Sequence, residues 1–216
     1  MWGLSTGACR VLAVHLFNEC FNFSRGSGGD DDDEDDDVWE QLRKLDNSLA
    51  NVFETLPLHL RCPENIDNVD AVFINLQLHT ALICIYRAAT TRSYLEIGTI
   101  PYVQERVFSS ALQIVTIVAL VADIHTSFRN PLISFATYIA GSFFLTDFVA
   151  SGNRQSEEKL TALMDVMVDV GKKNQFTASL AIRLAQELQT SGVDPNAMGK
   201  VSSAYALPSF ATRAGS

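Results

Sequence analysis

The chain has 216 residues, of which 47% are hydrophobic and 19% charged, and it contains only 6 prolines. This length and composition exclude a wholly disordered chain, a collagen-like repeat and a small cysteine-stapled domain, and they favour one globular domain. The formal net charge is −9, but the run Asp30–Asp37 is entirely acidic, and without it 17 acidic residues stand against 16 basic ones. Because phosphate binding requires a basic surface, this nearly neutral remainder predicts no direct DNA binding by the chain.

The four cysteines predict neither a zinc site nor a disulfide framework. Cys9, Cys20, Cys62 and Cys84 form no C-x-x-C pair, so we expect reduced thiols in an intracellular protein. The chain also lacks the pattern of a secretory signal. Its best membrane candidate, Val107–Ala122, is shorter than the roughly 20 apolar residues that a spanning helix needs, so we expect a core helix and no membrane contact.

Apolar periodicity predicts an all-α fold of about seven helices. On the first helix, the predicted inward face is the set Ala8, Val11, Leu12, Leu16, Cys20 and Phe23. The fifth helix begins after Asn130-Pro131, and Ser156 is the predicted N-cap of the sixth. The other predicted helices cover residues 5–23, 38–56, 68–90, 102–125 and 176–189.

Two of these helices are apolar on nearly every side, namely those over residues 68–90 and 102–125. A helix of this kind must be surrounded by others, so we expect a stack of helices around two buried central ones. The predicted organisation is one domain over residues 1–192, interrupted by a flexible acidic loop over residues 24–37. Residues 193–216 are predicted to form a disordered tail.

Known catalytic motifs are missing from the sequence. There is no H-E-x-x-H, G-x-S-x-G, P-loop or G-x-G-x-x-G pattern, so we expect no enzyme, no cofactor and no metal. The acidic run contains Asp32-Asp33-x-x-Asp36, which leaves a magnesium-dependent all-α enzyme as an alternative. We disfavour it because these acids follow a Gly/Ser-rich stretch instead of facing a cavity from a helix. The run beside Trp39 also has the composition of an acidic activation segment.

The helix over residues 68–90 carries the most informative polar side chains. These include Asn75, His79 and Arg87, with Gln77 on the stripe that also holds Arg87. One interpretation is a set of buried anchors, with Arg87 paired to Asp123 or Asp147, because an unpaired buried charge is costly. The alternative is the polar wall of a small-molecule effector pocket.

The same helix resembles one in a known family. The sequence LQLHTALICIYRAA, residues 76–89, resembles the helix L-x-x-x-Y-H-x-x-x-I-x-L-H-R-P/A of the regulatory domain, or middle homology region, of fungal zinc binuclear cluster transcription factors. His79 and Arg87 match, whereas Leu78 and Tyr86 replace Tyr and His. Three flanking segments resemble other motifs of that domain: LPLHLR at residues 56–61, Ser110-Ala111-x-x-Ile114, and residues 130–140 with Asn130-Pro131 and Tyr138.

The resemblance implies a non-enzymatic regulatory or interaction domain of a nuclear fungal transcription regulator. Its partners would be proteins of the transcription machinery or a second copy of the chain, with a small-molecule effector as the alternative ligand. The six-cysteine DNA-binding cluster of the family is missing, so zinc and specific DNA contacts are not carried over. We therefore expect a truncated or DNA-binding-deficient member.

Overall fold

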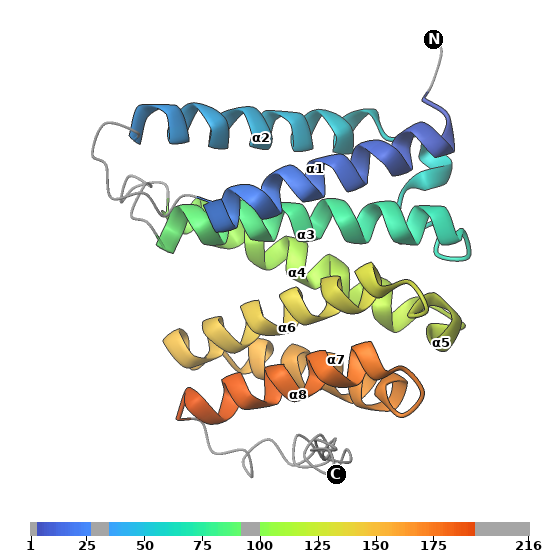
Figure 1. The fold of residues 1–216 in the computed structure, drawn as a ribbon, viewed down its shortest axis with the longest axis vertical. Coiled ribbons are helices and arrows are strands. Elements are labelled where there is room, and N and C mark those ends of the chain that lie inside the picture. Colours follow the sequence, from blue (N-terminus) through green and yellow to red (C-terminus); the bar gives the residue numbers. More distant parts are fainter. Residues whose placement is uncertain (1–3, 27–34, 92–99, 193–216) are drawn as a thin grey trace, which may run out of the picture. The chain divides into compact units, whose positions relative to one another are not determined.

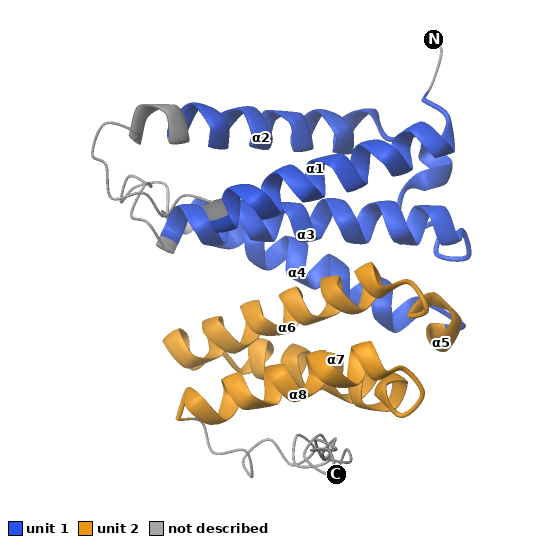
Figure 2. Ribbon diagram, viewed as in Figure 1, with its two compact units in different colours: residues 1–123 blue, residues 124–216 orange. Residues whose placement is uncertain are grey.

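The computed structural model describes residues 4–26, 35–91 and 100–192. In these residues it contains eight α-helices, one short 3-10 helix and no strand (Figure 1). The all-α class and the approximate helix number predicted from the sequence are therefore confirmed. The chain divides into two compact units, residues 1–123 and residues 124–216 (Figure 2). The range that the sequence treats as one domain thus includes parts of both units.

Unit 1 contains four long helices and one helical turn. They are α1 (Thr6–Gly26), α2 (Asp35–Thr55), η1 (Leu58–Leu60), α3 (Val69–Thr91) and α4 (Ile100–Leu120). The chain passes along α1, returns along α2 and then follows α3 in the same direction as α1 (Figure 1). Helix α3 packs against α1, α2, α4 and η1, and α1 also packs against α2. Unit 1 is therefore built around α3.

The sequence of α3 explains its central place. Every residue from Ala71 to Leu78 is buried, which agrees with a helix whose apolar residues cover all sides. Helix α4 is less enclosed than predicted: 39% of its most apolar window is buried, against 83% for α3. Of the two helices predicted to be central, α3 therefore has the more complete cover.

Helix α4 also ends earlier than predicted. It stops at Leu120, and a separate short helix, α5 (Ile124–Ser127), follows. Asp123 stands directly before α5, where an aspartate favours the start of a helix over the continuation of one. Apolar periodicity continues through this break, so it gave no sign of the break between α4 and α5.

The inward face of α1 differs in part from the predicted one. Val11 is 72% exposed and Ala8 is exposed as well, although both were predicted to face the core. The buried residues of α1 are Cys9, Ala13, Leu16, Phe17, Cys20 and Phe23. The helix is thus rotated relative to the prediction, because α3 and α2 cover a different strip of it.

The predicted acidic loop over residues 24–37 is shorter in the structure. Helix α1 continues to Gly26 and α2 begins at Asp35, so both ends of that range are helical. Acidic residues at the start of a helix are favoured by the positive end of the helix dipole. Residues 27–34 lie outside the described residues, and so does the predicted tail over residues 193–216.

Unit 2 contains α5 and three longer helices. These are α6 (Pro131–Ser151), α7 (Arg154–Gly171) and α8 (Gln175–Thr190), and they pack against one another. An asparagine caps each of the three at its N-terminus, namely Asn130, Asn153 and Asn174. The prediction for Asn130-Pro131 is confirmed, whereas Ser156 is not a cap. Ser156 is buried inside α7 and donates a hydrogen bond to the Asp147 carboxylate.

Glycine allows α7 and α8 to approach closely at their connection. A Cβ atom built on Gly171 would lie 3.1 Å from Cα of Ala178 and 3.3 Å from its Cβ. Asn174 connects the same turn to the segment that follows α5, because its Nδ2 donates a 2.8 Å hydrogen bond to the Phe128 carbonyl. Unit 2 therefore has its own packed core and its own hydrogen bonds between elements.

In the part of the chain that the structure describes, three helices, α3, α4 and α6, are long and apolar enough to cross a membrane when judged by length and composition alone. The expectation of no membrane contact stays a prediction.

Candidate functional site

Asn75 is a buried anchor between η1 and α3. Its side chain is 4% exposed, and Nδ2 donates hydrogen bonds of 2.7 Å to the carbonyl oxygens of Leu60 and Ala71. One bond lies within α3 and the other holds the end of η1 against it. Both N–H donors of the amide thus have partners, as a buried polar group requires.

His79 connects three helices of unit 1. Its Nδ1 forms a 3.3 Å hydrogen bond with Ser110 Oγ on α4, and its ring lies 4.9 Å from the ring of Phe53 on α2. Burial disfavours the charged imidazolium and lowers the pKa of His79 to about 4. The side chain is therefore neutral at pH 7, when it packs as a polar aromatic group between α2 and α4.

Arg87 lies two turns beyond His79 on α3 and is partly exposed. Eight residues along a helix correspond to about 12 Å of rise, so the guanidinium and the imidazole start from distant points of the axis. Of the two predicted partners, Asp123 follows α4 in unit 1. Asp147 belongs to unit 2, where it accepts hydrogen bonds from Asn153 and Ser156. Asn75 and His79 are thus one helical turn apart with partners in different elements, Leu60 of η1 and Ser110 of α4, whereas Arg87 lies two turns further along α3.

A polar cluster that the sequence did not predict joins α2, α3 and α4. Arg106 Nη1 donates a 2.9 Å hydrogen bond to the Tyr86 hydroxyl and a 3.2 Å bond to the Asp46 carboxylate. The guanidinium also lies over the rings of Tyr86 and Tyr102, at 5.4 and 5.7 Å from their centroids. Burial raises the pKa of Tyr86, and its hydrogen bond with Asp46 raises it further. The cluster therefore connects α2, α3 and α4 through polar side chains.

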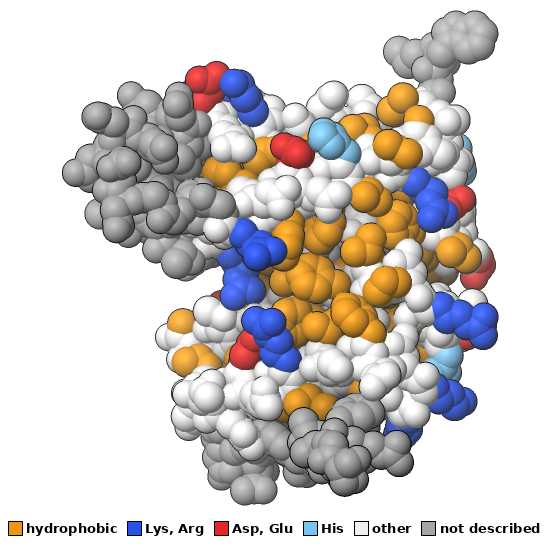
Figure 3. Space-filling view, in the orientation of Figure 1, with side chains coloured by type: hydrophobic (Ala, Val, Ile, Leu, Met, Phe, Trp, Pro, Cys, Tyr) orange, Lys and Arg blue, Asp and Glu red, His pale blue; other side chains and the backbone are white. Residues whose placement is uncertain are grey.

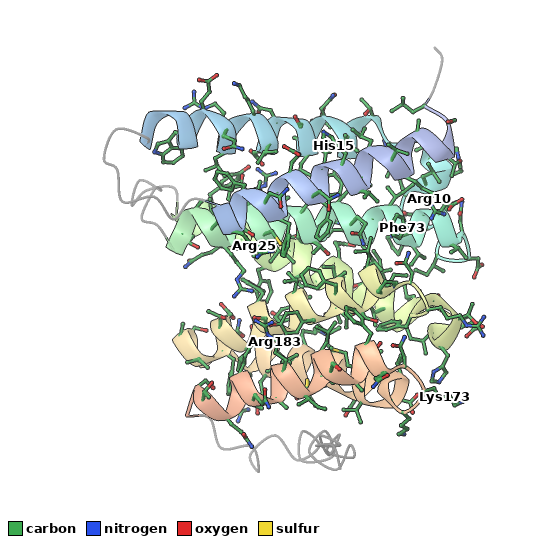
Figure 4. The ribbon with its side chains drawn as sticks, viewed as in Figure 1. Arg10, His15, Arg25, Phe73, Lys173 and Arg183 are labelled. Atoms are coloured by element: carbon green, nitrogen blue, oxygen red, sulfur yellow. The ribbon has the colours of Figure 1, made fainter. Side chains whose placement is uncertain are left out.

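An open groove lies along the outer side of α1, next to the start of α3. It has a volume of about 440 Å³, and the residues that line it are Arg10, Val11, Val14, His15, Asn18 and Phe73. Arg10 lies over the ring of Phe73, 4.9 Å from its centroid, and forms an ion pair with Asp70 (Figure 4). The groove is wide open to solvent, and Arg10, His15 and Asn18 make half of its lining residues polar, unlike the enclosed, mostly apolar clefts that hold small molecules.

Gln77 follows Phe73 by one helical turn on α3. Its side chain is 1% exposed, yet neither Oε1 nor Nε2 has a hydrogen-bond partner in the described part of the chain. On the same strip of α3, Phe73 contacts Arg10 and Cys84 interacts electrostatically with Cys20. The Gln77 amide therefore lies on the side of α3 that faces α1, and its hydrogen-bonding capacity is unused.

No group of three metal-binding side chains occurs among residues 4–26, 35–91 and 100–192. The acidic pattern Asp32-Asp33-x-x-Asp36, on which the enzyme alternative depends, lies outside the residues whose side chains are described. Comparison with known proteins gives no match, since no family model, no curated protein and no solved structure corresponds to the chain.

The sequence indicated some of these features. Gln77 stands out as a polar residue on an apolar helix, and its position on the stripe of Arg87 was predicted. The groove was missed because Val11 was predicted to face the core, whereas it is exposed. The Arg106 cluster was missed because its members come from three helices, and no local pattern connects Asp46 with Arg106.

Proposed function

We propose that this chain is a non-enzymatic regulatory domain of a nuclear fungal transcription regulator, which modulates transcription through contacts with other proteins. The proposal starts from the resemblance of residues 76–89 to the regulatory domains of zinc binuclear cluster factors. The contacts of Asn75 and His79 support it, because both side chains hold helices of unit 1 together instead of meeting at a reaction centre.

One end of unit 1 offers a surface for such contacts, and this observation carries the proposal. The start of α1, η1 and the first turn of α3 lie together at that end (Figure 1), and four large apolar side chains on these elements or just before α1 are exposed. They are Leu4, Val11, Leu58 and Val69, which are 51%, 72%, 76% and 67% exposed. Figure 3 shows hydrophobic side chains at the surface over this end. Clustered exposed apolar side chains are typical of protein interaction sites.

Two asparagines hold this apolar end in place. Asn65 Nδ2 donates to the Leu58 carbonyl at 2.8 Å, and Asn68 Nδ2 donates to the His59 carbonyl at 3.1 Å. These bonds fold the segment between η1 and α3 back on itself. Leu58 and Val69 therefore flank a turn that internal hydrogen bonds already hold in place. A partner that binds them would not have to pay the entropic cost of ordering this segment.

A tethering assay tests the proposal. The full chain is fused to a heterologous DNA-binding domain in yeast, and we expect reporter output to differ from that of the DNA-binding domain alone. The variant L58D/V69D should abolish the difference, because two carboxylates oppose apolar docking. The matched control, Val149→Asp, changes an exposed valine of α6 and should act like the wild type. An unchanged reporter, or equal activity of L58D/V69D and the wild type, would refute the proposal.

A further inference from the structure

Cys20 of α1 and Cys84 of α3 are buried on two helices that pack against each other. Their side chains are 0% and 5% exposed, and both are free cysteines. We propose that Cys20 and Cys84 form a redox modification site, at which a peroxide converts the two thiols into a disulfide that joins α1 to α3. This inference does not depend on the proposed role in transcription.

The register of the two helices places these cysteines at the same level. Helices α1 and α3 run in the same direction (Figure 1). Near their starts, Arg10 forms an ion pair with Asp70, and its guanidinium lies 4.9 Å from the centroid of the Phe73 ring. Cys20 follows Arg10 by ten residues, and Cys84 follows Phe73 by eleven. Both cysteines therefore lie about 15–17 Å further along their helices, at 1.5 Å per residue.

The faces of the two helices agree with this register. Eleven residues are close to three full turns, so Cys84 lies on the same face of α3 as Phe73, which contacts α1. On α1, Cys20 belongs to the buried strip that also includes Ala13 and Leu16. The two thiols are close enough to interact electrostatically, because charge on Cys84 adds to the effect of burial in raising the pKa of Cys20. Both sulfur atoms thus lie in one part of the interface between α1 and α3.

Burial controls how fast this pair reacts. It raises the pKa of both thiols to about 12, so almost no thiolate is present at pH 7. Because the thiolate is the nucleophile, the reaction requires local opening of α1 from α3. Arg87 then favours the thiolate of Cys84, whereas Glu19 and Asp46 disfavour that of Cys20. Cys84 is therefore the sulfur that attacks the oxidant.

The oxidation by hydrogen peroxide takes place in two steps. The Cys84 thiolate attacks one oxygen, the O–O bond breaks, and the hydroxide that leaves takes up the proton that Cys84 released. The resulting sulfenic acid reacts with Cys20: the S–S bond forms, the S–O bond breaks, and the leaving oxygen departs as water with the Cys20 proton. The two thiols thus lose two electrons and two protons, and one peroxide becomes two water molecules.

Peroxide treatment of the full chain under native conditions tests the proposal. Remaining thiols are blocked with iodoacetamide, and peptide mass spectrometry with and without reduction by dithiothreitol locates the disulfide. We expect an intramolecular bond between Cys20 and Cys84. The melting temperature should rise by at least about 5 °C, because the cross-link restricts the unfolded chain. Dithiothreitol should reverse both changes.

Four single variants decide which thiols form the bond. Cys20→Ala and Cys84→Ala should each lose the disulfide and the rise in melting temperature. Cys9→Ala, at a buried position of α1, and Cys62→Ala, at a partly exposed position, should keep both. Thermal unfolding of the untreated variants establishes which of them are folded, and one folded variant of each kind is enough for the comparison.

Three results would overturn the proposal. In the first, peroxide leaves Cys20 and Cys84 as free thiols. In the second, the disulfide includes Cys9 or Cys62, or it joins two chains. In the third, the bond between Cys20 and Cys84 forms but lowers the melting temperature, which would show that the native helices do not hold the two sulfurs at bonding distance. Failure of the tethering assay leaves these readouts unaffected, so the two proposals fail independently.

Discussion

The ring of His79 lies 4.9 Å from the ring of Phe53, so α3 and α2 meet through an aromatic pair of which one member can be protonated. Protonation would place a positive charge between helices, and burial lowers the pKa of His79 to about 4. The unfolded chain binds a proton near pH 6.5, whereas the folded chain does so only near pH 4. The contribution of neutral His79 to the free energy of unfolding is therefore fully present above pH 6.5 and is lost as the pH falls toward 4.

We expect this loss to be measurable by urea unfolding at several pH values. The free energy of unfolding should fall by up to about 3 kcal/mol between pH 6.5 and 4, given roughly 1.4 kcal/mol per pKa unit. His79→Phe keeps the ring contact and should flatten this part of the profile. His59→Gln, at an exposed position, should keep the wild-type profile. A His79 imidazole that titrates near pH 6.5 by NMR would contradict the account.

Removing the orphaned amide should stabilise the chain. Gln77→Met replaces a buried side chain with two unpartnered polar atoms by an apolar one of similar volume. We expect a gain of about 1–2 kcal/mol, the scale of the penalty for an unsatisfied buried group. Chemical unfolding measures it. A loss of stability would mean that the amide has a partner within the folded protein.

The Arg106 cluster should contribute to the stability of unit 1. Arg106 and Asp46 side chains are each 25% exposed, so solvent screens their attraction only in part. We expect Arg106→Met to lower the free energy of unfolding by about 1–3 kcal/mol, the range of hydrogen bonds to charged groups. Tyr86→Phe should cost less than Arg106→Met. A double-mutant cycle of the two should show coupling, and strict additivity would count against the cluster.

The two glycines Gly171 and Gly7 provide a matched pair of substitutions. Gly171→Ala would press a methyl group against the backbone of Ala178, so we expect it to destabilise unit 2 by about 1 kcal/mol. At Gly7, in the first turns of α1, an added Cβ meets nothing within 4 Å. Gly7→Ala should therefore stabilise by up to about 1 kcal/mol through helix propensity. Thermal unfolding separates the two, and a stabilising Gly171→Ala would show that α8 moves aside.

The sequence predicted helix starts and buried helices well where the deciding residues lie within one helix. Asn130-Pro131 marks the start of α6 because both residues favour a helix start for reasons within one turn. The central place of α3 followed from apolar residues on every side. The failures were of another kind. Periodicity could not decide whether Val11 or Ala13 of α1 faces inward, since the answer depends on the helices that cover it.

The candidate site was less predictable for the same reason. His79 and Asn75 stood out as polar residues on an apolar helix, but their partners Ser110 and Leu60 come from other elements. The sequence therefore identified side chains that needed partners without identifying the partners. No local pattern in the sequence marks Arg106, although it binds Tyr86 and Asp46.

Hydrogen exchange of the purified full chain, in buffer without detergent, tests the central claim that α3 is enclosed by the other helices of unit 1. The amides between Ile74 and Ile85 should exchange more slowly than those of α2 and α4, at rates that follow global unfolding. Exchange in α3 as fast as in α2 would contradict the account. Protection that arises only when detergent is added would also contradict it, because the cover of α3 would then be lipid-like and not protein.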